Sequence, residues 1–261
     1  MDLRIKGKTA LVLASSRGLG QAMACALARE GVNVAVTGRN AEGLAQTVKM
    51  IESVGGKALA LNWDLADLNA IDGHVQAVES QLGPIDILIN NTGGPPPTTA
   101  SGQDPQLWQK SFQEMVLSLM KITDRVLPGM RERRWGRIIT STTSGAIVPI
   151  RNLAISNTLR AALLGWSKTL AAEVAADGVT VNVIMPGRVA TDRLRQLDEA
   201  RAKRENITYD AVVSASLKTI PAGRYGDPKE YGDTAAFLAS QNASYITGSV
   251  IRVDGGQVPS I

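Results

Sequence analysis

Ser156 and Arg160 lie near the start of an amphipathic stretch, "LAISNTLRAALLGWSKTLAAEV", which covers residues 153–174. The pattern predicts a helix over residues 154–176, and a spacing of four places both side chains on one face, one turn apart. Serine can donate or accept a hydrogen bond, whereas arginine carries a permanent charge and only donates. The pair can therefore hold a ligand hydroxyl or stabilise an oxyanion, but it cannot exchange a proton near neutral pH.

A glycine-rich turn near the N-terminus indicates a nucleotide site. The segment "ALVLASSRGLGQAMACALAREG" reads as strand, tight turn and helix, with Gly18 and Gly20 where the turn enters the helix. Glycines at this place let backbone N–H groups approach a diphosphate at a helix N-terminus. The next strand ends in "VTGRN", where Gly38 and Arg39 stand in place of the acid that holds an NAD ribose. Arg39, with Arg17 as a second cation, favours the 2′-phosphate of NADP(H), and ordinary surface arginines are the alternative interpretation.

The elements that must position these residues alternate regularly. The 261 residues contain strand-like apolar runs at 9–14, 32–38, 58–63, 85–90, 136–141, 179–186 and 248–254. Helical patterns occupy residues 18–30, 41–54, 68–82, 104–134, 154–176 and 228–240. This alternation predicts an α/β, doubly wound parallel sheet, the Rossmann fold, with about seven strands and helices on both faces. We expect a single domain over 1–261, with a polar, arginine-rich, helical insertion at about 188–222 over one edge of the sheet.

Composition excludes several classes of function. One cysteine, Cys25, and one histidine, His74, predict no internal disulfide and no metal site. A net charge of +4 is too mild to indicate a nucleic-acid partner. No apolar run is long enough to span a membrane, and that at the N-terminus is too short for a signal peptide. We expect a cytoplasmic protein with a small-molecule substrate.

Six motifs resemble those of the short-chain dehydrogenases/reductases. They are "ASSRGLG" (14–20), "NWDLAD" (62–67), "NNTG" (90–93), "GRIITSTTSG" (136–145), "VNVIMPGRVAT" (181–191) and "ITGSVIRVDGG" (246–256). The resemblance covers about residues 5–256 and is greatest to bacterial 3-oxoacyl-[acyl-carrier-protein] reductase-like members. It implies a dinucleotide-dependent oxidoreductase, commonly a tetramer, in which "VDGG" packs between subunits.

The resemblance also implies roles for individual residues. Asp64 and Leu65 would contact the adenine, Asn90 would lie beside the adenosine ribose, and Thr191 would contact the nicotinamide amide, whereas Asp86 would be structural. The complete set expected to bind NADP(H) is Ser16, Arg17, Gly18, Leu19, Gly20, Arg39, Asp64, Leu65, Asn90, Thr92, Gly93, Arg160, Pro186, Gly187 and Thr191.

The sequence departs from the family at its catalytic residues. The family uses Asn, Ser, Tyr and Lys, and the corresponding places hold Met115, Thr143, Ser156 and Arg160. A tyrosine beside a cation can deliver a proton to the alkoxide that forms when hydride adds to a carbonyl. A serine hydroxyl is a far weaker acid, and the Tyr-x-x-x-Lys pair is therefore lost.

A second departure lies in the glycine-rich turn. The family's pattern opens with a glycine after threonine, and here Leu13 and Ala14 stand at those places. A methyl group costs on the order of 1 kcal/mol if the backbone angles there are unusual.

Two functional hypotheses follow. The first is an NADP(H)-dependent oxidoreductase for a carbonyl, an alcohol or a related small substrate, with Thr143, Ser156 and Arg160 as a non-standard catalytic set. The alternative is a catalytically inactive dinucleotide-binding protein that acts as a sensor or partner subunit. A lyase or isomerase that reuses the pocket stays open as a third class. Tyr209, in the insertion, is either a replacement acid or an ordinary lid residue.

Two further features have open interpretations. The segment "NTGGPPPTT" (91–99) is either a stiff wall beside the nicotinamide or a plain rigid loop. Arg188, Arg193 and Arg195, at the start of the insertion, either meet an acidic substrate or form a solvated helix face.

Overall fold

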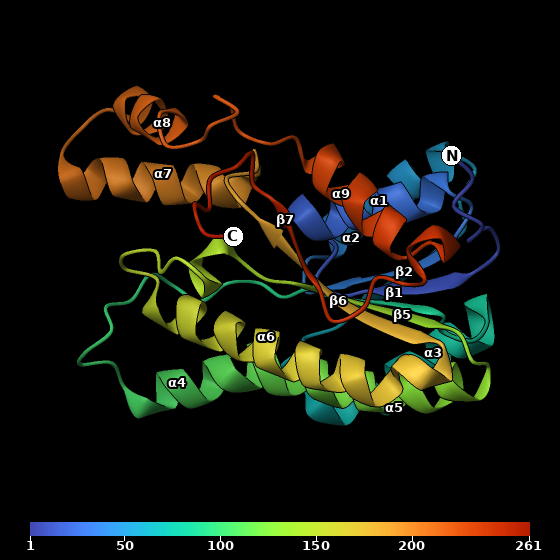
Figure 1. Cartoon of the computed structure of the whole chain (residues 1–261). Helices are drawn as coiled ribbons and strands as arrows, with labels where there is room; N and C mark the ends of the chain where they lie inside the picture. The colour runs from blue at the N-terminus through green and yellow to red at the C-terminus, as the bar shows by residue number, and fades with distance from the viewer.

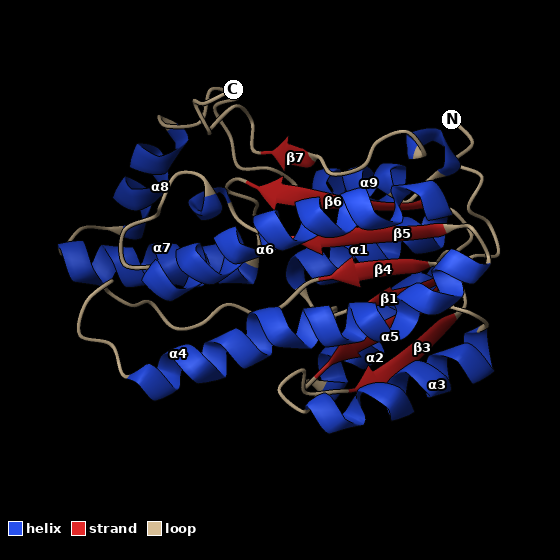
Figure 2. Ribbon diagram, turned by 60° about the horizontal axis from the view of Figure 1, so that its bottom comes forward, coloured by secondary structure: helices blue, strands red, loops and turns tan.

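Seven parallel strands form one sheet in the computed structural model, which describes residues 1–261 (Figures 1 and 2). Their spatial order is β3-β2-β1-β4-β5-β6-β7, so that the order reverses between β1 and β4. This confirms the predicted Rossmann fold, in which ligands bind beyond the carboxyl ends of the strands at that reversal. The strands are β1 (Thr9–Val12), β2 (Asn33–Gly38), β3 (Ala58–Asn62), β4 (Ile87–Asn90), β5 (Gly136–Ser141), β6 (Val179–Pro186) and β7 (Val250–Val253).

Helices cover both faces of the sheet, as the continuous apolar strands predict. One face carries α1 (Gly18–Arg29), α2 (Ala41–Ser53) and α9 (Pro228–Leu238), as Figure 1 shows. The other face carries α3 (Ile71–Leu82), α4 (Pro105–Phe112), α5 (Ser118–Glu132) and α6 (Ala154–Val174). No helix is both long enough and apolar enough to cross a bilayer.

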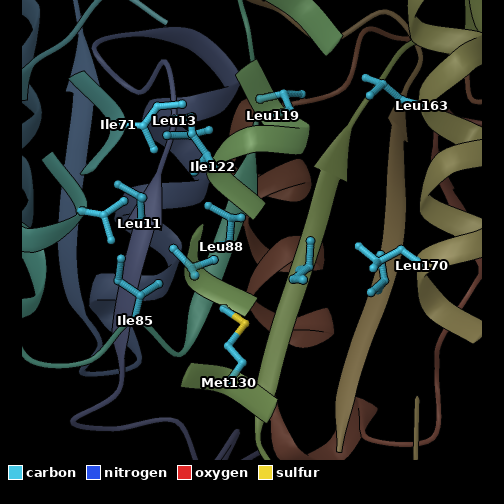
Figure 3. Close-up of a cluster of buried hydrophobic side chains, with 14 of the residues drawn as sticks. Leu11, Leu13, Ile71, Ile85, Leu88, Leu119, Ile122, Met130, Leu163 and Leu170 are labelled. Atoms are coloured by element: carbon cyan, nitrogen blue, oxygen red, sulfur yellow. The ribbon is translucent and has the colours of Figure 1, made fainter. Parts of the chain in front are cut away.

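Two apolar clusters, one on each side of the sheet, form the core. Figure 3 shows the cluster beneath α3, α5 and α6, to which the central strands contribute Leu11 and Leu88 and the helices contribute Ile122 and Leu163. The second cluster packs α1 and α9 against the opposite face and contains Cys25, the cysteine expected in the core.

The expected helix over 104–134 contains an interruption. Residues Gln113–Leu117 form one turn of π-helix between α4 and α5, and Met115 lies within it, 2% exposed. Such turns frequently mark functional sites. Here the turn places in the core the side chain of Met115, which the resemblance matches to the family's asparagine.

The segment 188–222 forms two helices, α7 (Asp192–Glu205) and α8 (Tyr209–Leu217). We expected them over one edge of the sheet, and Figure 2 shows them beyond the carboxyl ends of the strands. Asp198 of α7, 1% exposed, fastens the segment by accepting hydrogen bonds from Arg188 at 2.7 Å and from the Tyr225 hydroxyl at 2.9 Å.

The β1–α1 turn is strained at Ala14. Its φ of 47° lies in the left-handed region, where an L-residue with a side chain is disfavoured. Asn91 braces the turn, because its Nδ2 donates to the carbonyls of Leu13 and Ala14 at 3.2 and 3.1 Å. Only glycine fits at position 20, since a Cβ there would lie 2.3 Å from the Ala14 carbonyl oxygen. The unusual angles considered from the sequence are therefore present.

Replacing Ala14 by glycine should raise the free energy of unfolding by up to about 1 kcal/mol, because glycine adopts the left-handed conformation without a steric cost. Ala22→Gly, in the helical part of α1, is the matched control and should lower it by roughly the same amount. Chemical denaturation of the three proteins measures both effects. A loss of stability in Ala14→Gly equal to that in Ala22→Gly would contradict the strain.

Removing the Asp198 carboxylate should destabilise the chain by about 3 kcal/mol, because Arg188 then loses its partner in a largely buried place. Glu199→Ala, one residue along the same helix, breaks only the exposed pair with Arg195 and should cost at most about 0.5 kcal/mol. Thermal and urea unfolding of Asp198→Ala and Glu199→Ala compare the two. Equal effects would show that Asp198 does not anchor the segment.

Candidate active site

The N-terminus of α1 is open to an anion. Arg17 occupies the N-cap position with no side-chain cap, and the first turn contains no acidic residue. The backbone N–H groups of this turn are left to bind a ligand. Thr191, the N-cap of α7, lies against this turn, because a Cβ at Gly18 would be 3.9 Å from its Cγ2. The structure thus brings Thr191 and the glycine-rich turn together.

The carboxyl ends of the strands, where a doubly wound sheet binds its ligand in a crevice, are the expected site, and the tips of β2 and β3 form its second part. The Arg39 side chain is 73% exposed, and its Nη1 lies 3.6 Å from Oδ2 of Asp64. Gly38 leaves room for Ser16, whose Oγ would be 3.1 Å from a Cβ at that position. An accessible guanidinium beside the α1 turn fits the 2′-phosphate of NADP(H), and the open helix end fits its diphosphate.

Asn90 differs from the expectation. It is fully buried, and its Nδ2 donates to Oγ1 of Thr123 on α5 at 3.1 Å, which turns the side chain away from the crevice. The next residue, Asn91, instead braces the β1–α1 turn. Successive strand residues point to opposite faces, so this period of two was the signal that distinguishes the two asparagines of "NNTG".

Arg160 crosses the interior of the crevice, with 7% of the residue exposed. Its Nη1 donates to the Ser141 carbonyl at 3.1 Å, and its Nη2 donates to the carbonyls of Thr92 at 3.1 Å and Gly93 at 3.2 Å. The guanidinium therefore joins the ends of β4 and β5. Burial away from water lowers the pKa of Arg160 to about 10, and no carboxylate pairs with it.

The hydroxyls near Arg160 are held in different ways. Thr143 Oγ1 accepts from Gly145 N at 3.3 Å and caps a short 3₁₀ turn. Ser156 is half-buried one turn before Arg160 and makes no hydrogen bond within the chain, so its hydroxyl is free for a ligand. Thr142 Oγ1 is buried without a partner.

The proline-containing loop 91–99 is fixed to the start of α6. Thr98 accepts hydrogen bonds from Ala154 N through its carbonyl, at 3.1 Å, and from Ile155 N through its hydroxyl, at 3.3 Å. Arg160 holds the other end of the loop. The loop is therefore held at both ends beside Arg160, which agrees both with a wall beside the nicotinamide and with a plain rigid loop.

None of the four tyrosines lies on α6. Tyr209 is exposed on α8, Tyr245 is fully exposed, and Tyr225 donates to Asp198. Tyr231, which sequence analysis did not single out as a site residue, is fully buried on α9. Its hydroxyl donates to the Ile184 carbonyl at 3.0 Å and pairs with Ser141 Oγ at 2.9 Å. Burial raises the pKa of Tyr231, which makes it a poorer acid than a free phenol.

The remaining expected cofactor residues also serve the fold. Leu19 and Leu65 are half-buried against the two apolar clusters. Pro186 ends β6, and Gly187 follows it where a Cβ would lie 2.7 Å from Cα of Asp254. Asp86 is buried and accepts a hydrogen bond from the backbone N–H of Thr9, which agrees with a structural role.

Comparison with known proteins gives matches along almost the whole chain. A family model described as enoyl-(acyl carrier protein) reductase matches residues 13–257. The 3-oxoacyl-[acyl-carrier-protein] reductase FabG of Vibrio cholerae is 34% identical over 256 residues, covering 97% of this chain and 98% of the relative. The NADPH-dependent reductase BacG of Bacillus subtilis is 32% identical over 256 residues, with coverages of 97% and 99%.

A solved structure agrees with these matches. The L-sorbose reductase of Gluconobacter frateurii, complexed with NADPH and L-sorbose, superposes with a TM-score of 0.94 at 31% identity, and each chain is covered completely, at 100%. The open α1 turn and the strand order agree with these similarities, which extend over nearly the whole chain. The chain belongs to the short-chain dehydrogenase/reductase family.

Proposed function

We propose that this chain is an NADP(H)-dependent oxidoreductase that acts on a carbonyl, an alcohol or a related small substrate with a non-standard catalytic set. The assignment of NADP(H) rests on the exposed Arg39 guanidinium and the uncapped N-terminus of α1. The name of the B. subtilis relative and the NADPH complex of the sorbose reductase support the same cofactor. The name of the V. cholerae relative, a reductase, supports the reaction class.

The residues that would hold NADP(H) come from several strand ends. Backbone N–H groups of residues 18–20 and the Arg17 side chain would bind the diphosphate, and Arg39 would bind the 2′-phosphate. Thr191 would hold the nicotinamide end, with Arg160 at the adjoining ribose. When bound, NADPH supplies a hydride to the substrate.

Three residues would serve the substrate. Ser156 and Thr143 would orient its oxygen by hydrogen bonds, and the positive charge of Arg160 would stabilise negative charge that develops on it. None of the three is suited to deliver a proton near neutral pH, so solvent would supply it. Such a site suits substrates that need hydride transfer with little help from an enzyme acid.

The remaining features of the proposal concern architecture. We treat residues 1–261 as one domain in which segment 188–222 covers the substrate site. We expect a homotetramer from the resemblance of "VDGG" (253–256) to a segment that packs between subunits.

The alternative is an inactive dinucleotide-binding protein. The combination of Met115, Ser156 and Arg160 favours it, because acid, relay and cation all differ from the family pattern. An inactive binder should change NADPH fluorescence on binding yet oxidise no NADPH with any substrate offered. Consumption of NADPH with a defined product excludes it.

NADPH should bind at least about tenfold more tightly than NADH, because Arg39 can make charge-assisted hydrogen bonds to a 2′-phosphate. Fluorescence titration of both cofactors measures the ratio. Arg39→Ala should remove most of the preference, whereas Arg131→Ala, another exposed arginine with its own carboxylate partner, should keep it. Equal affinities of the parent protein for NADPH and NADH would refute the role of Arg39.

Simple ketones and 3-oxoacyl thioesters should be reduced at a rate roughly 10²–10⁴-fold lower than by an enzyme with a positioned acid. Steady-state assays of NADPH consumption on a panel of such substrates test this. Ser156→Ala should leave NADPH affinity unchanged, since its hydroxyl is assigned to the substrate. Turnover at about 10 s⁻¹, a typical enzyme value, would mean that another acid acts, and Tyr209→Phe would then be the first variant to assay.

A further inference from the structure

Arg193 stands apart from the other arginines of segment 188–222. Five arginines lie in this segment. Four of them pair with carboxylates at 2.7–3.2 Å: Arg188 with Asp198, Arg195 with Glu199, and Arg201 and Arg204 with Glu205. Arg193 has no carboxylate partner. The remaining arginine charges of the segment are thus neutralised locally, and that of Arg193 is not.

The Arg193 side chain reaches the loop that borders the crevice. Its Nη2 donates to the Pro95 carbonyl at 3.0 Å and would lie 3.4 Å from a Cβ at Gly94. One hydrogen bond thus orients the guanidinium, while Nε and Nη1 donate to no protein acceptor. The N–H groups of Nε and Nη1 are therefore left for an anion.

A second cation without a carboxylate partner, Arg160 of α6, contacts the same loop. Arg160 holds the carbonyls of Thr92 and Gly93, directly before Gly94 and Pro95, and it too lacks a carboxylate partner. The two charges influence each other, because Arg193 helps to lower the pKa of Arg160, although burial is the larger cause. A buried cation without a counter-charge is costly, and an anion bound nearby would offset that cost.

Residues 95–97 of the loop cannot bind an anion with their backbone, because three successive prolines have no N–H groups. The carbonyls of Thr92, Gly93 and Pro95 accept hydrogen bonds from the two guanidinium groups. Positive charge at this border of the crevice therefore comes from side chains alone. The same loop is fixed by Thr98 to the start of α6, two residues before Ser156.

We propose that Arg193, with the charge of Arg160 behind it, binds the carboxylate of an anionic substrate. This inference rests on the proposed function, since it names the class of substrate for the same crevice. A diphosphate of the cofactor is the other source of negative charge. The uncapped α1 turn and Arg17 already provide for that group, whereas Arg193 is turned toward the Gly94–Pro95 border.

The test uses matched charged and neutral probes and needs no turnover. Benzoate and acetate are titrated calorimetrically into the full chain saturated with NADPH, alongside benzamide and acetamide. Each carboxylate should bind about tenfold or more tightly than its amide, as a charge-assisted bond implies. Arg193→Met should abolish this preference and Arg193→Lys should retain part of it. Arg195→Met, a control on the same helix, should retain all of it.

Three results would overturn the proposal. The first is equal binding of carboxylates and amides by the parent protein. The second is a preference for carboxylates that is unchanged in Arg193→Met. The third is a lower NADPH affinity of Arg193→Met when the parent protein shows no preference for carboxylates. The third would assign Arg193 to the cofactor diphosphate. Titration of NADPH alone comes first, so its failure to bind would count against the proposed function. The probes are then titrated into the chain without cofactor, and the same preference is expected there.

Discussion

The crevice depends on the hydrogen bonds that the Arg160 guanidinium donates to three backbone carbonyls. The guanidinium reaches from α6 to the carbonyls of Ser141, Thr92 and Gly93, and so joins the ends of β5 and β4 with one buried side chain. A lysine ammonium is a compact charge on a flexible stem, whereas the planar fork of arginine donates in several fixed directions. An arginine at position 160, where the resemblance implies a lysine, therefore holds three carbonyls in directions that a lysine could not reach together.

The β1–α1 turn beside this crevice combines close packing with backbone strain. Ala14 keeps a left-handed conformation because Asn91 holds two adjacent carbonyls and Gly20 leaves space for the Ala14 oxygen. Strain of this kind persists where the surrounding structure determines it, and it is common at functional sites. A cofactor-binding turn can thus form without the family's first glycine.

Much of the fold followed from the sequence. The strand runs and helical periods identified all seven strands and the flanking helices, because each buried element must carry a long apolar pattern. The period of two could also have separated Asn90 from Asn91. The positions of α7 and α8 could not be read in this way, since polar helices carry no pattern that indicates which part of the sheet they approach.

The site was less accessible to sequence reasoning for a physical reason. Residue types showed that Ser156 and Arg160 share a helix face, but not that the guanidinium would donate to three backbone carbonyls. Pairing of charges depends on three-dimensional distance, so the isolation of Arg193 among paired neighbours was invisible in a run of arginines and acids. The same holds for Tyr231, which approaches Ser141 from α9.

The most direct test of the account is the affinity for NADPH of Arg160→Met, measured by fluorescence titration with the fold checked by circular dichroism. If Arg160 organises the crevice and holds the cofactor, the variant should keep its secondary structure and bind NADPH about tenfold or more weakly, as the loss of a buried charge-assisted bond implies. A folded Arg160→Met variant that binds NADPH as tightly as the parent protein would contradict the account.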